Sequence, residues 1–190
     1  MKVVVLADHD QQKILATTTN SDELVWAGSF DEFLRSEAEV FIDLLFDGSE
    51  LRIKALQQLK PSMVIINSVE NCLSEIDPGF IRINAWNSFL DKEIIEASGA
   101  AILHAKAEAV FSSFHKKLFW LPDQPGFVTP RVISMIINEA FLLLREGGST
   151  KEDIDLAMKL GTNYPYGPFE WCELIGEDKV RALILALDNE

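Results

Sequence analysis

The side chains most able to perform acid–base, nucleophilic or metal chemistry are few in this sequence and lie far apart. The histidines are His9, His104 and His115, and the cysteines are Cys72 and Cys172. None of them shows the H-x-x-x-H, C-x-x-C or H-E-x-x-H spacing that brings metal ligands together on one helix or turn. We therefore expect no metal site. Two well-separated cysteines also indicate a reduced intracellular chain rather than a disulfide scaffold.

The residues that follow the first apolar run of the chain are unsuitable for binding a dinucleotide. Val3–Leu6 is a continuous apolar run, typical of a strand buried on both faces. A dinucleotide fold needs glycines directly after this strand, because the backbone must turn tightly and approach the pyrophosphate. The residues here are Ala7-Asp8-His9-Asp10-Gln11-Gln12, and the first glycine of the chain is Gly28. Two carboxylates would face the diphosphate at close range, so the loop predicts that NAD is not bound.

Apolar runs and helical patterns alternate through the first two thirds of the chain. The expected strands are Val3–Leu6, Leu24–Ala27, Val40–Phe46, Met63–Ile66, Phe80–Ile83, Ile94–Ala97 and Leu118–Leu121. Helices are expected at Asp31–Glu37, between Ser49 and Pro61, and at Ala105–Phe114. Strands separated by helices indicate a largely parallel, doubly wound sheet.

The last third of the chain shows helical patterns alone. Ser149 and Glu152 are spaced as a capping box, which predicts a helix that begins there and ends at Gly161. The other expected helices are Val132–Arg145, Phe169–Ile175 and Glu177–Leu187. A Pro-rich segment at residues 122–125 suggests the boundary between the two parts.

Composition limits the classes of partner. The 190 residues carry a formal net charge of −13, which repels nucleic acid and anionic membrane surfaces. No apolar run reaches the ~18–20 residues of a membrane span, and the first residues lack a signal-peptide pattern. We expect a cytoplasmic protein with no nucleic-acid or membrane partner.

Short motifs follow one another in a fixed order from Gly126 to Gly176. They are Gly126-Phe127-Val128-Thr129-Pro130-Arg131, Asn138-Glu139-Ala140, Glu152-Asp153-Ile154-Asp155 with Ala157-Met158 and Gly161, and Tyr164-Pro165-Tyr166-Gly167-Pro168-Phe169-Glu170. This series closely resembles the C-terminal helical domain of 3-hydroxyacyl-CoA dehydrogenases, whose pattern is G-F-I-x-N-R, N-E-A, E-D-I-D-x-A-M-x-x-G and Y-P-x-G-P-F-E. The resemblance implies a preceding NAD-binding domain, a 3-hydroxyacyl-CoA substrate and dimerisation through the helical domain.

The same resemblance locates the catalytic positions. The family's H-F-x-N-P motif corresponds to Asn84-Ala85-Trp86-Asn87-Ser88, and the glutamate that orients the histidine corresponds to Glu96. Asparagine replaces the histidine. An amide can donate a hydrogen bond to Glu96 but cannot take a proton near neutral pH, so the general base is absent. A purely structural polar pair is the alternative interpretation of Asn84 and Glu96.

Two further family positions are changed. The family's S-N-T-S-S-L turn corresponds to residues 67–73, where Asn71 or Cys72 stands in place of a catalytic hydroxyl. The substrate-contacting asparagine of G-F-I-x-N-R is Pro130, which has neither a side-chain donor nor an N–H. No catalytic residue is therefore expected to be intact. The candidates for ligand binding are Ser68, Asn71, Asn84, Asn87 and Glu96.

These observations predict a truncated Rossmann-like α/β domain over residues 1–122, joined to an all-helical domain over residues 123–190. The leading hypothesis is a dehydrogenase-like protein without NAD and without catalysis, which binds an acyl-CoA-like ligand or a protein partner. The alternatives are a working NAD-dependent 3-hydroxyacyl-CoA dehydrogenase with an atypical site, and a structural subunit of an intact paralogue.

A homodimer is also expected. The helix predicted at Val132–Arg145 is apolar on more than one face, and a small helical domain has little interior in which to bury that surface. A second subunit would cover it. The competing explanation is that the α/β domain covers the surplus face.

Overall fold

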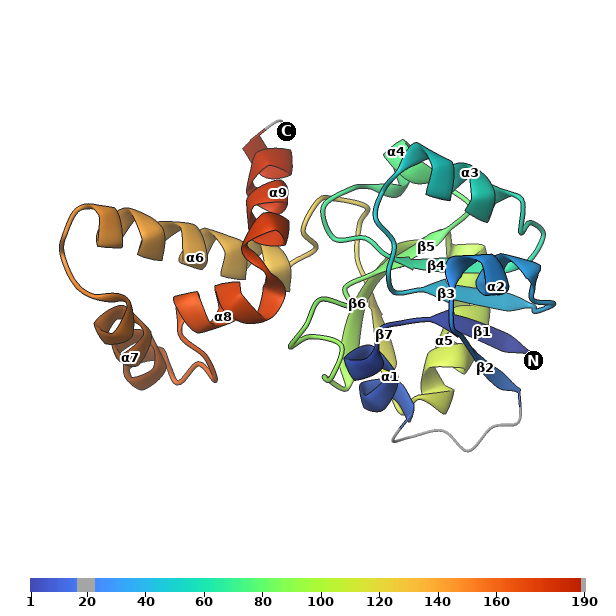
Figure 1. Cartoon of the computed structure of the whole chain (residues 1–190), viewed down its shortest axis with the longest axis horizontal. Helices are drawn as coiled ribbons and strands as arrows, with labels where there is room; N and C mark the ends of the chain where they lie inside the picture. The colour runs from blue at the N-terminus through green and yellow to red at the C-terminus, as the bar shows by residue number, and fades with distance from the viewer. Residues whose placement is uncertain (17–22, 189–190) are drawn as a thin grey trace. The chain divides into compact units, whose positions relative to one another are not determined.

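The computed structural model describes residues 1–16 and 23–188, which form two compact units (Figure 1). The α/β unit comprises Met1–Phe127, and the helical unit comprises Val128–Glu190. No helix in the described parts of the chain combines the length and the apolar character needed to cross a membrane.

The α/β unit is built on one seven-stranded sheet. Its strands are β1 (Val3–Leu6), β2 (Leu24–Ala27), β3 (Val40–Asp43), β4 (Met63–Asn67), β5 (Ile81–Ile83), β6 (Ile94–Gly99) and β7 (Lys117–Trp120). Their spatial order is β2-β1-β3-β4-β5-β6-β7. All neighbours are parallel except β5 and β6. The predicted Rossmann-like α/β class, followed by a helical region, is confirmed.

Helices cover both faces of the sheet, because alternate strand residues point to opposite sides. Val3 and Val5 pack in one buried cluster with Leu15 and Phe111, whereas Val4 packs in a second cluster. The helices of this unit are α1 (His9–Ala16), α2 (Phe30–Arg35), α3 (Glu50–Gln57), α4 (Leu73–Ile76) and α5 (His104–Ser113), with a 3₁₀ turn at Ala101–Leu103. α1 and α5 contribute to the first cluster, and α2, α3 and α4 contribute to the second.

The antiparallel β5–β6 pair depends on one glycine. Gly99 lies opposite Ile81 in the register, and a Cβ on Gly99 would come within 2.9 Å of Ile81 Cγ1. Only a residue without a side chain allows the strands to approach this closely. The prediction of a largely parallel sheet did not specify the direction of this pair. The loop from β5 to β6 reverses the chain, since a parallel neighbour needs a longer crossover.

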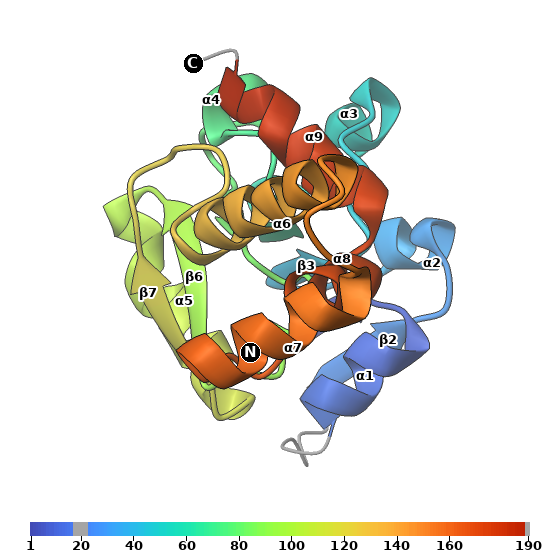
Figure 2. The same ribbon diagram turned by 90° about the vertical axis from the view of Figure 1, so that its left-hand side faces the viewer.

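The helical unit contains four helices within its described residues, 128–188 (Figure 2). They are α6 (Thr129–Arg145), α7 (Lys151–Thr162), α8 (Pro168–Ile175) and α9 (Glu177–Asp188). α6 contacts α8 and α9, and α7 packs against α8. A small buried cluster of Ala140, Ile154 and Phe169 joins α6, α7 and α8.

The start and end of α7 differ from the sequence prediction. The capping residue is Thr150 rather than Ser149: its Oγ1 accepts from the Asp153 amide at 3.2 Å and donates to the Asp153 carboxylate at 2.8 Å. The helix continues through Gly161 and ends at Thr162, where Asn163 adopts a left-handed conformation with φ 58°. Asparagine tolerates this conformation, so it can replace the expected glycine stop.

A buried carboxylate on α7 caps α8. Asp155 Oδ1 accepts a hydrogen bond from the Phe169 amide at 2.8 Å, and Oδ2 accepts from the Glu170 amide at 3.3 Å. Gly167 permits this approach, since a Cβ there would lie 2.3 Å from Asp155 Oδ1. The E-D-I-D and Y-P-x-G-P-F-E segments are therefore complementary parts of one helix junction.

We expect Asp155→Ala to lower the free energy of unfolding by about 1–2 kcal/mol, because two amides at the start of α8 lose their acceptor. Urea denaturation followed by circular dichroism measures the loss. Glu152→Ala is the matched control: this exposed carboxylate lies on the same helix, and its removal should change stability by less than about 0.5 kcal/mol. Equal effects of the two substitutions would contradict the capping role.

Candidate functional site

The carboxyl edge of the sheet is the place where an open α/β fold binds ligands. The chain passes from β1 to β2 on one side and then returns to β3 on the other, so the order reverses between β1 and β3. Ligands of doubly wound sheets bind in the crevice outside this switch point. The residues that meet there are the β1–α1 turn and the segments that follow β3 and β4.

The start of α1 is occupied by the chain's own carboxylate. Asp8 Oδ1 accepts hydrogen bonds from the Asp10 amide at 2.9 Å and from the Gln11 amide at 2.8 Å. The Asp8 amide in turn donates to Gln11 Oε1 at 3.0 Å. First-turn amides of this kind are the groups that a helix offers to a bound phosphate. Here they already have a negatively charged partner.

Side-chain amides form hydrogen bonds with backbone groups further along the edge. The Leu44 carbonyl accepts from Gln11 Nε2 at 3.4 Å and from Asn67 Nδ2 at 3.3 Å. Asn67 Oδ1 accepts from the Ala85 amide at 3.0 Å. These bonds connect α1 with the segments after β3, β4 and β5. The backbone groups at the switch point are thus paired within the protein.

An ion pair that the motif analysis did not identify lies directly beside this edge. Arg52 on α3 donates to Asp43 through Nε at 2.7 Å and through Nη2 at 2.8 Å, and its guanidinium lies 4.2 Å from the centre of the Phe30 ring. Burial raises the pKa of Asp43 from its ordinary value, while the Arg52 hydrogen bonds act in the opposite direction. The sequence analysis placed Asp43 inside a strand predicted to continue to Phe46, whereas β3 ends at Asp43. It did not identify Arg52 as the partner of Asp43. The pair is already satisfied internally.

The two residues that the resemblance assigns to the family's catalytic pair, Asn84 and Glu96, lie in contact. Asn84 follows β5 and Glu96 lies in β6, and the Asn84 amide donates to the Glu96 carbonyl at 2.9 Å. Asn84 Nδ2 also donates to Glu96 Oε2 at 3.1 Å, and its Oδ1 accepts from the Trp86 amide at 3.3 Å. Both side chains are buried. The arrangement holds Asn84 rigidly, but it contains no group on Asn84 that can take up a proton.

The other candidate residues are dispersed. Ser68 is buried and donates from Oγ to the Asn71 carbonyl at 3.0 Å, whereas the side chains of Asn71 and Asn87 are exposed. Ser88, at the position of the family's proline, has φ 74°, and its buried Oγ has no hydrogen-bond partner among the described residues. Pro130 belongs to the helical unit, where it lies in the first turn of α6. A proline is favourable there because the first amides of a helix need no partner within the helix.

Residues 121–127, which we call the strap, are held against the carboxyl edge by Arg82. Arg82 is fully buried and donates to Asp123 Oδ1 at 2.6 Å, to the Gln124 carbonyl at 2.5 Å and to the Ser68 carbonyl at 3.3 Å. Its guanidinium also lies 4.0 Å from the centre of the Phe127 ring. One cation therefore fixes the end of the α/β unit to the turn after β4.

Asp123→Asn should reduce the free energy of unfolding by about 3 kcal/mol, because it leaves the buried Arg82 charge without its carboxylate. Urea denaturation provides the measurement. Glu93→Gln is the control, since it breaks a Lys117–Glu93 ion pair of similar length, 2.7 Å, whose two side chains are both well exposed. Water and salt screen an exposed pair, so its loss should change stability far less than the loss of the Asp123 carboxylate. Similar losses from the two substitutions would show that Arg82 does not hold the strap.

Comparison with known proteins agrees with this architecture. Residues 126–190 match the family model described as "3-hydroxyacyl-CoA dehydrogenase, C-terminal domain". The hydroxyacyl-coenzyme A dehydrogenase of Sus scrofa mitochondria is 31% identical over 173 residues, which cover 89% of this chain and 54% of the relative. The 3-hydroxyadipyl-CoA dehydrogenase of Escherichia coli is 42% identical over 74 residues, covering 39% of this chain and 16% of the relative.

Among solved structures, the (S)-3-hydroxybutyryl-CoA dehydrogenase of Ralstonia eutropha superposes with a TM-score of 0.76 at 20% identity. The match covers 100% of this chain and 87% of that one, and it shows a common fold. The chain belongs to the 3-hydroxyacyl-CoA dehydrogenase family. The matched part of the chain spans 54% of the length of the Sus scrofa relative and 16% of the length of the Escherichia coli relative.

Proposed function

We propose that this chain is a family member that neither binds NAD nor transfers hydride, and that it acts as a dimeric protein that binds an acyl-CoA-like ligand or a protein partner. The observation that carries the first part is the Asp8 carboxylate at the start of α1. A pyrophosphate would have to displace this carboxylate from the two amides, and the two anions would then repel each other at close range. The residues present do not fit the dinucleotide.

The position of the general base supports the same proposal. Asn84 occupies the family's histidine position and is hydrogen-bonded to Glu96 and to the Trp86 amide. Loss of a general base alone lowers a rate by about 10²–10⁴-fold. The internally paired nucleotide loop adds an independent obstacle. A substitution that restores the general base at Asn84 leaves the Asp8 cap in place, and the reverse also holds.

A thermal-shift and calorimetry panel tests the ligand proposal. NAD and NADH should give no saturable binding up to millimolar concentration, whereas acetoacetyl-CoA should stabilise the chain. A ligand at 100 times its dissociation constant adds about 2.7 kcal/mol of stability, which both methods detect. Micromolar NAD binding would overturn the proposal. No response to acetoacetyl-CoA would leave a protein partner as the ligand class.

A kinetic experiment tests the loss of chemistry. The wild-type chain should not oxidise 3-hydroxybutyryl-CoA with NAD above background, as followed by absorbance of NADH, and Asn84→His should not restore turnover because the Asp8 cap remains. A family member active on this substrate serves as the positive control. Turnover by wild type, or by Asn84→His alone, would be inconsistent with two separate obstacles.

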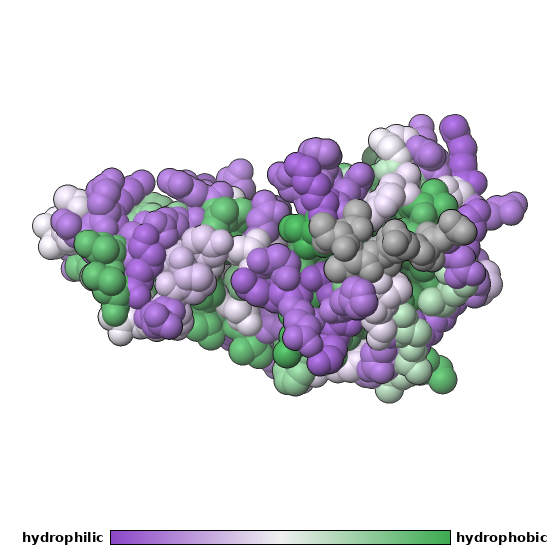
Figure 3. All heavy atoms as spheres, turned by 90° about the horizontal axis from the view of Figure 1, so that it is seen from below, coloured by the Kyte–Doolittle hydropathy of each residue, from purple (hydrophilic) through white to green (hydrophobic). Residues whose placement is uncertain are grey.

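The exposed apolar surface of the helical unit supports the proposed dimer. Large apolar side chains are exposed on each of its helices, and Figure 3 shows apolar residues reaching the surface between hydrophilic ones. They are Val128, Val132, Met135 and Leu143 on or beside α6, Leu156 and Leu160 on α7, Leu174 on α8, and Leu185 on α9. Soluble monomers rarely leave large apolar patches uncovered, so a second subunit is the economical explanation.

A further inference from the structure

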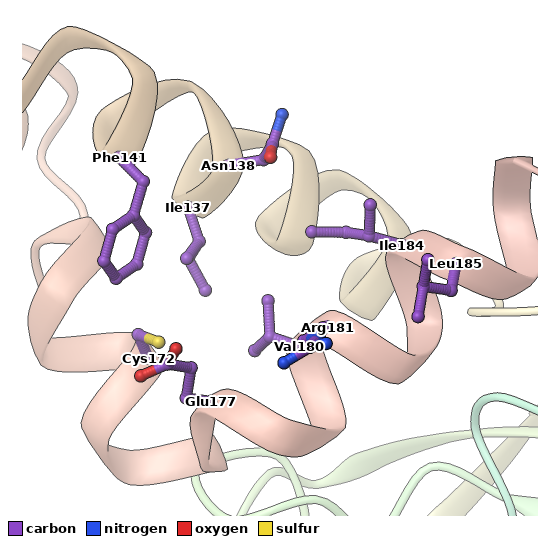
Figure 4. A pocket seen from close by; sticks show the side chains of 9 residues that line it. All are labelled: Ile137, Asn138, Phe141, Cys172, Glu177, Val180, Arg181, Ile184 and Leu185. Atoms are coloured by element: carbon purple, nitrogen blue, oxygen red, sulfur yellow. The ribbon is translucent and has the colours of Figure 1, made fainter. Parts of the chain in front are cut away.

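The helical unit contains an apolar groove of about 220 Å³ between α6, α8 and α9. Ile137 and Phe141 point into it from α6, toward Cys172 of α8 and Val180 of α9 (Figure 4). Burial raises the pKa of the Cys172 thiol, so this wall of the groove is uncharged at neutral pH. An engineered apolar cavity of about 150 Å³ in another protein binds benzene, so the groove is large enough for the side chain of a phenylalanine or a leucine.

Two opposite charges lie beside these apolar walls, one turn apart on α9. Glu177 and Arg181 both line the groove and are both exposed. After burial, the Glu177 charge is the next cause that raises the pKa of the Cys172 thiol, which places this carboxylate near the apolar wall. Neither Glu177 nor Arg181 forms an ion pair with another residue in the part of the chain that the structure describes. The groove therefore offers one carboxylate and one guanidinium to a ligand.

This arrangement is complementary to a small zwitterion with an apolar body. Residues four apart on a helix are separated by about 6 Å along its axis, so the two side chains can reach charged groups on neighbouring atoms of one ligand. In an α-amino acid, the ammonium, the carboxylate and the side chain all leave from one carbon atom. With its ammonium on Glu177 and its carboxylate on Arg181, an amino acid bound along α9 extends its side chain toward α6.

Ligands with a single charge fit the groove less well. A fatty carboxylate would bring its charge close to Glu177 and would be repelled by the net charge of −13 of the chain. An alkylammonium ion would meet the like charge of Arg181. A zwitterion pairs with both groups and has no net charge of its own. Hydrogen bonds between charged groups are about twice as strong as those between neutral groups, so the two charges fix the orientation of the ligand.

We propose that this groove is a binding site for a free α-amino acid with a large apolar side chain, such as phenylalanine or leucine. The Glu177 carboxylate accepts hydrogen bonds from the ammonium, and the Arg181 guanidinium donates to the carboxylate. The apolar side chain lies between α6 and α9. The site lies wholly within the helical unit, and it goes beyond the proposed function because it involves neither the Asp8 cap nor Asn84.

An NMR titration of the isotope-labelled full chain tests the site. L-phenylalanine should shift backbone amide signals of α6, α8 and α9 saturably, with a dissociation constant on the order of 1 mM. Three analogues each lack one part of the ligand: phenylalanine methyl ester lacks the carboxylate, phenylpropionate lacks the ammonium, and glycine lacks the apolar side chain. Each should bind about tenfold more weakly, because one set of contacts is lost.

Two variants assign the charges. Glu177→Gln and Arg181→Gln should each weaken the binding of L-phenylalanine about tenfold. Glu177→Gln should not weaken phenylpropionate, which has no ammonium, and Arg181→Gln should not weaken the methyl ester, which has no carboxylate. Asp178→Asn and Lys179→Gln are the matched controls, since these exposed residues of α9 do not line the groove, and both should bind L-phenylalanine as wild type does. Circular dichroism verifies that every variant is folded.

Several results would contradict the site. If no signal shifts saturably, or if the shifts are confined to the α/β unit, the groove does not bind an amino acid. Equal affinities for L-phenylalanine and phenylpropionate would exclude Glu177 as the ammonium partner, and equal affinities for L-phenylalanine and its methyl ester would exclude Arg181 as the carboxylate partner. Either equality would overturn the zwitterion. No sample contains NAD or CoA, so failure here leaves the proposed loss of NAD binding standing.

Discussion

Polar backbone groups at the carboxyl edge of a parallel sheet must have partners, and in this chain the partners are its own side chains. Asp8 takes the first-turn amides of α1, Asn67 bridges the Leu44 carbonyl and the Ala85 amide, and Arg82 binds the Ser68 and Gln124 carbonyls. An unpaired buried polar group costs about 1–3 kcal/mol, so these bonds stabilise the edge. Among them, the Asp8 bonds occupy first-turn amides of the kind that bind phosphate.

Under the proposed function, this internal pairing would account for a family fold that is retained without the family's chemistry. The sheet order and the Asn84–Glu96 contact depend on strand register, which apolar packing on both faces determines. Hydride transfer depends instead on a few groups at the edge. A change from histidine to asparagine, or from a glycine turn to an aspartate cap, alters those groups without disturbing the register. The fold therefore depends on the strand residues, whereas Asp8 and Asn84 lie in segments that follow strands.

The helical unit differs from the α/β unit in how it buries its apolar surface. Its internal core is small, and one of its junctions depends on the buried Asp155 carboxylate at the start of α8. Much of its apolar surface stays at the outside or lines the groove between α6 and α9. A unit of this size can bury only part of its apolar surface by itself. Two of its family motifs meet at the α7–α8 junction, and Asn138 of a third motif lines a groove between α6, α8 and α9.

The sequence by itself determined the class of fold, most strands and helices, and the identity of the family, because hydrophobic periodicity and turn residues act locally. It also showed that the glycine turn and the histidine are missing. It did not predict α1, since the residues after β1 were interpreted as a loop, whereas Asp8 caps a helix there. The sequence prediction did not give the direction of the β5–β6 pair, and it missed the cap at Thr150 and the partner of Asp43.

Only the tertiary structure decided which polar groups meet. Arg82 and Asp123 are far apart in the chain, as are Asp155 and the amides of α8, and no local pattern connects them. The groove likewise arises from three helices whose separate sequences show only that each has an apolar face. Hydrogen bonds and cavities form between groups that lie close together in space, and the packing of the whole unit determines which groups these are.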